Sequence, residues 1–400
     1  MQTPKFVFVS NYINHHQIPI CDELYRLLGG SFAFCQTEEI EKERLSMGWA
    51  DDRPEYVVCY YENPAKYQDW IDTCEVVFFG GTDEESYIQK RLAQMKPIIR
   101  YSERLYKTGQ WKAISPRGLR KKYLDHTRYR KQDVYMLCSG AYVPSDFSIV
   151  KAYPNKMLRW GYFPEIKEQD VDKLFANKKA GNILWAARFI DWKHPELPIE
   201  LAVYLKEKGY AFHLDMIGTG VMLEEMKNLA VSLSVEDKVT FHGPKTPAGV
   251  REAMENANIY LITSDRQEGW GAVLNEAMNS GCAVVTNHMI GAAPYMISHG
   301  ENGLFYKDGD KQMLFSKVVE LLKDREQVKR LGKAGYETVM KLWNPAVAAR
   351  QLLALSMRLG FLEQADVPEI ANWQEIPTEG PCSITPVISE RKMWKVLTNR

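Results

Sequence analysis

Short apolar runs alternate with amphipathic helical stretches along the chain, and this alternation occurs twice. The run KFVFVS (5–10) is apolar almost throughout, as in strands buried on both faces. In the stretch that follows (18–29), apolar residues recur three or four positions apart, as in a helix. Alternating strands and helices predict parallel sheets covered by helices on both faces. We therefore expect an α/β protein with two Rossmann-like domains facing each other across a deep cleft.

The alternation breaks once, in a polar stretch without a strand, and resumes at residue 183. This break predicts an N-terminal Rossmann-like domain over residues 1–165, a linker over 166–182 and a second Rossmann-like domain over 183–360. Residues 361–400 are rich in proline and acidic residues and have little periodicity. We expect them to form an arm that packs along the body or is partly disordered.

Composition narrows the choice of partners and compartment. The formal net charge is +0, so nothing global attracts nucleic acid, and we expect no nucleic-acid partner. None of the seven cysteines pair at C-x-x-C spacing, which predicts reduced core thiols. The N-terminus does not resemble a signal peptide, and no stretch approaches the roughly 20 apolar residues that span a bilayer. We expect a cytoplasmic protein that is soluble or peripheral on the inner face of the membrane.

One segment departs from this overall charge balance. Residues 117–131 contain seven Arg or Lys and a single acid, Asp125. One interpretation is a solvated helix face. The other is a patch that contacts phosphates or an anionic membrane, where each basic residue contributes ~1 kcal/mol.

In parallel sheets ligands bind beyond the carboxyl ends of the strands, so the strand exits are the places to search. Arg188 and Lys193 follow the strand at 183–188 and could converge on one anion, or form a surface salt bridge instead. Gly218 and Gly220 follow the next strand. They either permit close backbone approach to a ligand or only make the turn.

Two strand exits in the first half of the chain are also polar. The first strand leads into a cluster of amides and imidazoles: Asn11, Asn14, His15, His16 and Gln17. A histidine there could act as a base or hold a polar ligand; the alternative is capping and surface hydrogen bonding. Glu103 and Arg104 follow a later strand, either as a buried ion pair or as a polar wall of the cleft. We predict His15 and His16 as catalytic candidates and assign acceptor binding to Asn11, Asn14, Gln17, Glu103 and Arg104.

The stretch EGWGAVLNE joins the strand at 259–264 to a helix that we expect to begin near residue 272. Its glycines would open the N–H groups of the helix end to an anion such as a diphosphate. Glu268 and Glu276 cannot favour a phosphate and are better suited to sugar hydroxyls. The pattern suits a nucleotide-sugar, while an ordinary capped corner with two surface glutamates remains the alternative.

Together these segments resemble glycosyltransferase family 4, the large retaining group with the GT-B fold. The resemblance covers residues 183–306, where EGWGAVLNEAMNSGCAVVTN is similar to the E-x₇-E signature and HGENGLFY to the segment that follows it. AARFIDWKHPELPIELAVYL resembles the stretch that supplies the phosphate-binding pair. The first half has only a looser likeness to enzymes of cell-surface polysaccharide assembly, in SNYINHHQ, RYSERLYK and WGYFPE.

The resemblance implies a role for each matching position. Arg188 and Lys193 would hold the donor diphosphate, and Glu276 the ribose. Glu268 would be a catalytic residue that binds the donor sugar near the reacting carbon. Further donor contacts, largely through the backbone, are implied for Gly218, Gly220, Gly243, Gly269, Trp270 and Gly271.

The resemblance also implies a reaction. It would be retaining, metal-independent transfer from a nucleotide-sugar, expected to be UDP-linked, to a glycan or lipid-linked acceptor in surface polysaccharide synthesis. No metal or other cofactor is expected. The alternatives are a non-catalytic nucleotide-sugar-binding scaffold and a nucleotide-sugar epimerase on the same fold; a phosphorylase would need a longer chain.

The chain departs from the family pattern at three positions. The Gly-Gly pair that many members carry after the first strand is absent, which directs attention to Asn14, His15 or His16 instead. Ala187 replaces the glycine before the phosphate-binding arginine, and His194 replaces the glycine after the lysine.

Overall fold

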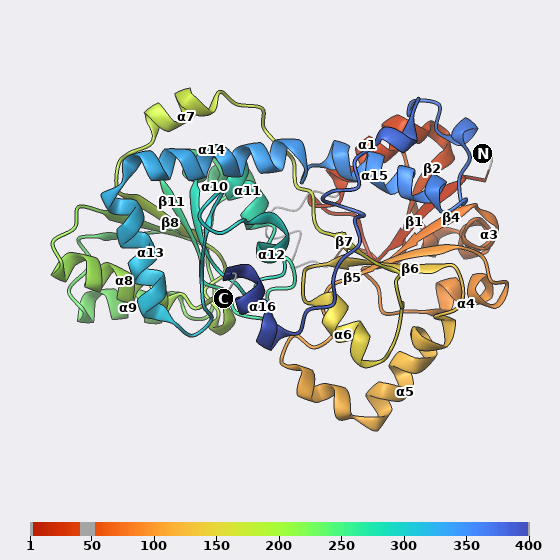
Figure 1. Ribbon diagram of the computed structural model, residues 1–400, viewed down its shortest axis with the longest axis horizontal. Helices are drawn as coiled ribbons and strands as arrows, with labels where there is room; N and C mark the ends of the chain where they lie inside the picture. Colours follow the sequence, from red (N-terminus) through yellow and green to blue (C-terminus); the bar gives the residue numbers. More distant parts are fainter. Residues whose placement is uncertain (1–2, 41–52, 399–400) are drawn as a thin grey trace. The chain divides into compact units, whose positions relative to one another are not determined.

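The computed structural model describes residues 3–40 and 53–398. Contacts divide the chain into two compact units, which are described separately (Figure 1). Each unit takes in two segments of the chain: Met1–Glu165 with Leu342–Ser389 in unit 1, and Ile166–Lys341 with Glu390–Arg400 in unit 2.

Unit 1 is built on a seven-stranded parallel sheet in the order β3-β2-β1-β4-β5-β6-β7. Its strands are β1 (Phe6–Ser10), β2 (Phe32–Gln36), β3 (Val57–Cys59), β4 (Val76–Phe79), β5 (Ile98–Ser102), β6 (Val134–Ser139) and β7 (Met157–Trp160). Every residue of β1, β2 and β4 is buried, as the apolar runs predict for strands covered on both faces. The strand order reverses between β1 and β4, so their exit loops diverge and leave room for a ligand.

The helices of unit 1 begin at clear sequence signals. Asn63, Ser115 and Asn344 each cap a helix, and a proline follows directly at its first position. The helices are α1 (Ile18–Leu28), α3 (Pro64–Thr73), α4 (Ser86–Ala93), α5 (Pro116–Asp125), α6 (Val143–Ile149) and α15 (Pro345–Arg358). None of the residues of α5 is buried, which sets this helix apart from the others in the unit.

Unit 2 is built on a six-stranded parallel sheet in the order β10-β9-β8-β11-β12-β13. Its strands are β8 (Asn182–Ala186), β9 (His213–Ile217), β10 (Val239–Gly243), β11 (Ile259–Ile262), β12 (Ala283–Asn287) and β13 (Leu304–Tyr306). The order reverses between β8 and β11. Two parallel α/β sheets confirm the predicted fold class, and a cleft between the domains stays a prediction.

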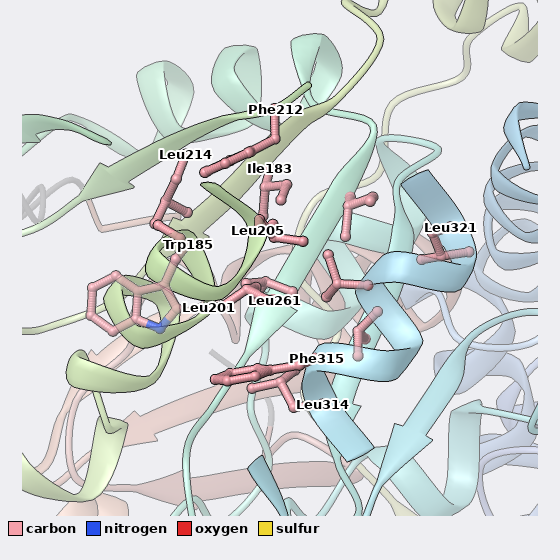
Figure 2. Close-up of a cluster of buried hydrophobic side chains, with 14 of the residues drawn as sticks. Ile183, Trp185, Leu201, Leu205, Phe212, Leu214, Leu261, Leu314, Phe315 and Leu321 are labelled. Atoms are coloured by element: carbon pink, nitrogen blue, oxygen red, sulfur yellow. The ribbon is translucent and has the colours of Figure 1, made fainter. Parts of the chain in front are cut away.

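The sheet of unit 2 packs against helices through a large apolar core (Figure 2). Trp185 of β8 and Phe315 of the helix after β13 are both buried in it, each contributing on the order of 1.5–3 kcal/mol. The helices are α7 (Val171–Asn177), α8 (Glu196–Glu207), α9 (Leu223–Ser232), α10 (Pro247–Asn256), α11 (Val273–Asn279), α12 (Ala293–Met296), α13 (Lys311–Lys323), α14 (Arg325–Lys341) and α16 (Glu390–Thr398).

The division into units differs from the predicted domains at the expected linker and at α15, whereas the expected arm does pack on the body. The expected linker contains α7 and belongs to unit 2, whereas α15, expected in the second domain, packs against α1 in unit 1. The expected arm continues along unit 1, where the amide of Arg159 donates to the carbonyl of Ser383 (2.7 Å), and ends as α16 in unit 2. Helical periodicity reveals an apolar face but not the sheet that covers it, which is why the sequence misplaced α15.

Candidate functional site

The exit loops of β8 and β11 are joined where the strand order of unit 2 reverses. The hydroxyl of Thr263 donates to the carbonyl of Lys193 (2.6 Å) and accepts a hydrogen bond from the buried indole of Trp185 (2.8 Å). The amide of Asp265 donates to the carbonyl of Trp192 (3.0 Å). These bonds fix the backbone on which the predicted phosphate-binding lysine stands.

Lys193 and Glu268 form an ion pair at this junction. Their side chains are only 12% and 15% exposed, so the pair is largely shielded from water. The Lys193 ammonium lies 4.4 Å from the centre of the Trp192 ring, and the Arg188 guanidinium lies 5.7 Å from the same ring. Four side chains therefore converge, three of them predicted; Trp192 was missed because nothing in the sequence shows that both cations would lie over it.

Glu276 lies one turn inside α11 and is half-buried. Within the described part of the chain its carboxylate accepts no hydrogen bond, although the guanidinium of Arg251 is near enough to favour its charge. Burial dominates and raises the pKa of Glu276 to about 7. A half-buried carboxylate without a donor is suited to accept hydroxyls from a ligand, as predicted for the ribose.

The Gly269–Gly271 turn is held from inside the unit. Trp270 has no exposed surface; its indole N–H donates to Asn275 Oδ1 (3.0 Å), and its carbonyl accepts from the amide of Ala292 (2.9 Å). Its ring is thus an internal anchor of the turn and has no surface for stacking on a donor. Gly271 has a φ of +89°, and a Cβ there would lie 3.3 Å from Glu268 Cγ, so glycine keeps the space that Glu268 occupies.

Gly218 and Gly220 serve the packing of two loops. Their φ values are +138° and +154°, and a Cβ would lie 1.9 Å from the carbonyl oxygen of Ala187 and 2.4 Å from that of Phe189. Close packing between the exits of β8 and β9 therefore explains both glycines, in line with the turn interpretation. Gly243, with a φ of +70°, has open space at its Cβ position and remains suited to close approach by a ligand.

His194, which replaces a glycine of the family pattern, has the backbone conformation that a glycine would favour. Its φ of +50° lies in the left-handed region that favours glycine, the residue the family carries here. The ring is held by Asp265 and Glu196, with Nδ1 2.9 Å from Glu196 Oε1. Hydrogen bonds to Asp265 and then Glu196 raise the pKa of His194 to about 10, so it is a cation beside Lys193 at neutral pH.

The polar cluster after β1 is largely bonded to itself. The amide of Asn14 donates to Gln17 Oε1 (2.8 Å), and the amide of Gln17 donates to the hydroxyl of Tyr101 (3.1 Å). Asn14 also accepts from the backbone N–H of His16 (3.0 Å). These bonds match local hydrogen bonding by Asn14 and Gln17, but the N-cap residue of α1, Gln17, makes no side-chain capping bond, and acceptor binding stays a prediction. The rings of His15 and His16 lie 3.9 Å apart and are half-exposed.

Of the other three predicted acceptor residues, Asn11 accepts from the hydroxyl of Ser10 (3.3 Å) and is half-exposed. For Glu103 and Arg104 the sequence leaves two alternatives open, a buried ion pair between them or a polar wall of the cleft. Arg104 is buried against Asp146 (3.4 Å), with side chains 1% and 0% exposed, because a buried cation requires a buried partner.

Glu103 accepts from the hydroxyl of Tyr162 (2.9 Å) and from Lys107 (2.5 Å) and lines a cavity of about 770 Å³ in unit 1. Sequence reasoning missed this cavity as a whole. Two sequence features could have indicated the cavity. They are the Gly80–Gly81 pair after β4 and the basic segment 117–131, part of which forms one wall.

Part of the sequence is similar to known proteins. Residues 166–338 match the family model described as glycosyl transferases group 1. Amylovoran biosynthesis glycosyltransferase AmsK of Erwinia amylovora is 29% identical over 182 residues, which cover 44% of each chain. Mannosylfructose-phosphate synthase of Agrobacterium fabrum is 32% identical over 152 residues, covering 37% of this chain and 33% of that protein. These alignments span less than half the length of the relatives.

Solved structures resemble nearly the whole fold. Alr3699/HepE of Anabaena in complex with UDP aligns with a TM-score of 0.66 at 14% identity, over 88% of this chain and 99% of that one. The lipopolysaccharide outer core galactosyltransferase WaaB aligns with a TM-score of 0.61 at 15% identity, over 85% and 95%. At this identity the likeness shows the fold alone, which is GT-B. In sequence, residues 166–338 are similar to the glycosyl transferases group 1 family, a match that covers less than half of the chain.

Proposed function

We propose that the chain is a retaining glycosyltransferase that moves a sugar from a UDP-linked donor to a glycan or lipid-linked acceptor in cell-surface polysaccharide synthesis. The observation that carries the proposal is the Lys193–Glu268 pair at the reversal of the sheet, with Arg188 over the same indole. A neighbour of the same fold whose structure contains UDP and a relative in amylovoran biosynthesis support the choice of donor and pathway class.

In this proposal the ion pair changes partners when the donor binds. Lys193 turns from Glu268 to the diphosphate, with Arg188 as the second cation, and Glu268 is released to accept hydroxyls of the donor sugar. Each charge keeps the other in place until then, so neither is left unpaired and half-buried. Glu276, which has no donor in the described structure, accepts the ribose hydroxyls.

The reaction breaks the bond between the anomeric carbon of the donor and the phosphate oxygen. The acceptor hydroxyl forms the new bond on the same face, and its proton passes to the leaving phosphate, so that UDP departs. Arg188 and Lys193 stabilise the negative charge that develops on that phosphate. His15 and His16 remain the predicted catalytic candidates of unit 1.

We further propose that α5 docks on an anionic membrane. None of its residues is buried, and it presents Leu119 and Tyr123 beside basic residues of the segment 117–131. No helix among the described residues has the length and apolar character needed to cross a bilayer. The proposed position is peripheral, on the cytoplasmic face.

A thermal-shift screen of nucleotide-sugars tests the function. A donor at 100 times its dissociation constant is expected to stabilise the protein by about 2.7 kcal/mol. We expect UDP-sugars to do this and GDP-sugars to do it less. A scaffold would bind the donor without ever releasing UDP, and an epimerase would convert the donor sugar without an acceptor; either result would replace the proposed activity.

A further inference from the structure

The cavity of about 770 Å³ lies wholly within unit 1, beyond the carboxyl ends of β4 and β5. The Gly80–Gly81 pair and Tyr101 contribute to its lining, and α5 forms another wall through Lys121, Lys122 and Asp125. It lies at the edge of the sheet where parallel α/β units bind ligands. Its volume is enough for a disaccharide-sized group with a phosphate attached.

Most cations that line this cavity already have an anionic partner. Lys121 pairs with Asp125 (2.9 Å), and Lys107 pairs with Glu103 (2.5 Å). Lys122 differs: it is half-buried, and in the described part of the chain its ammonium makes no ion pair within 4 Å and no hydrogen bond. Burial lowers the pKa of Lys122, although Asp83 and Asp125 oppose this from a distance.

Lys112 is a second cation on the cavity wall without an ion pair among the described residues. It is exposed and lies 5.7 Å from the centre of the Trp111 ring. Lys112 and Lys122 therefore offer two positive charges to one cavity, which the carboxylates of Glu38 and Asp83 also line without an ion pair to either lysine within 4 Å. A dianionic group such as a phosphate is the ligand chemistry that completes such a site.

The stretch 111–123, which contains Lys112 and Lys122, also carries exposed apolar side chains. Trp111 and Ile114 are 67% and 79% exposed, and Leu119 and Tyr123 are exposed as well. At 100° per residue, Leu119 and Tyr123 lie on the face of α5 opposite to Lys121 and Asp125. Figure 1 shows α5 at the periphery of unit 1. We call Leu119 and Tyr123, together with the exposed Trp111 and Ile114 that precede α5, the apolar ridge.

We propose that this cavity receives the acceptor by its phosphate, and that the acceptor is a sugar joined through a phosphate or diphosphate to a long apolar chain. Lys112 and Lys122 bind the phosphate, and the ridge of Trp111, Ile114, Leu119 and Tyr123 contacts the apolar chain at the membrane surface. The hydroxyls of Ser102 and Thr108, which also line the cavity, face the sugar. This inference rests on the proposed transferase function and names its acceptor class.

Isothermal titration with four probes tests the site: farnesyl diphosphate, inorganic pyrophosphate, glucose 1-phosphate and, as the neutral control, farnesol. Lys122→Met is expected to lower the affinity for the three phosphate probes by about tenfold or more. This is the usual effect of removing a hydrogen bond to a charged group. Lys66→Met is the matched control, because Lys66 is also half-buried in unit 1 and has no ion pair with any described residue, but lies outside the cavity. It should leave all four affinities unchanged.

The apolar ridge is tested by Trp111→Ser combined with Ile114→Ser. This variant should lose affinity for farnesyl diphosphate while keeping that for pyrophosphate. Equal loss for both probes, or none for either, would overturn the lipid assignment and leave a soluble sugar phosphate as the acceptor. Phosphate probes that bind Lys122→Met as tightly as the wild type, or that bind the wild type no better than farnesol, would overturn the site itself.

The donor side supplies an independent readout. Lys122→Met should keep the full thermal shift with UDP, because Arg188 and Lys193 belong to unit 2. If UDP fails to stabilise the wild type, the proposed function fails, whatever the phosphate probes show in unit 1.

Discussion

The two units place the same kind of sheet under two different sites. In both, the strand order reverses beside the first strand, β1 in unit 1 and β8 in unit 2. In unit 2 the loops at the reversal are tied by hydrogen bonds, and Lys193 has its counter-ion in Glu268. In unit 1 a wide cavity is lined by Lys122, which is half-buried and forms no ion pair within 4 Å among the residues that the structure describes. The two units thus differ in that the charges at the reversal of unit 2 are already paired, whereas the cavity of unit 1 retains the cation to which we assign the acceptor phosphate.

The largest effect should come from the carboxylate of unit 2. Glu268→Gln removes the charge to which we assign the orientation of the donor sugar, and it is expected to lower kcat/KM for transfer by roughly 100-fold or more. Release of UDP in the presence of acceptor is the measurement. Glu103→Gln, at a strand exit of unit 1, is the control for donor binding and should leave UDP affinity unchanged. Transfer at the wild-type rate in Glu268→Gln would contradict the assignment of the donor site to unit 2.

A second effect concerns Glu276 and pH. Because burial raises the pKa of Glu276 to about 7, the carboxylate is half-protonated near neutrality and accepts ribose hydroxyls better as the pH rises. UDP affinity should therefore increase between pH 6 and pH 8, and Glu276→Gln should weaken it by about tenfold and flatten the profile. Titration calorimetry at several pH values measures both.

The same raised pKa makes the folded state less stable as the pH rises, whereas it makes UDP binding stronger. The folded chain holds a proton on Glu276 that the unfolded chain releases above pH 4.5, so the free energy of unfolding falls as the pH rises from about 4.5 to 7. Glu276→Gln should remove this part of the slope. An unchanged slope in the variant would contradict the burial of the carboxylate.

A third effect tests the outer surface of unit 1. Arg117→Gln and Arg120→Gln should each weaken association with anionic vesicles by about fivefold at low salt, and the wild type should lose most binding at high salt. Arg330→Gln, an exposed arginine of unit 2, is the matched control. Binding is measured by sedimentation with the vesicles. If the wild type does not sediment with them at low salt, the proposed membrane association is wrong.

The smallest effect should come from His194. Its pKa is raised by Asp265 and Glu196, so its stabilising charge is fully present below about pH 6.5 and is lost as the pH rises towards 10. The ring is partly exposed, and solvent screening limits its contribution to about 1 kcal/mol or less. The Tm difference between wild type and His194→Ala should therefore be greatest near pH 6 and shrink at high pH. A difference that grows with pH would contradict the ion pairs.

The sequence predicted those features that depend on local patterns. Apolar runs revealed both parallel sheets, and the motif positions led to Lys193 and Glu268, which the structure brings together. The sequence did not predict that the indole of Trp270 faces inward, since an aromatic between two glycines looks equally suited to stacking on a ligand. The cavity of unit 1 was missed because its walls come from positions between 38 and 162, which only the folded sheet brings together.

The central claim is that the exit loops of β8 and β11 in unit 2 bind a nucleotide-sugar. A crystal structure of the protein with UDP tests it most directly. We expect Arg188 and Lys193 on the diphosphate, the ribose hydroxyls on Glu276, and Lys193 separated from Glu268. UDP bound elsewhere, or bound here with the Lys193–Glu268 pair intact and no phosphate contact from either cation, would contradict the account.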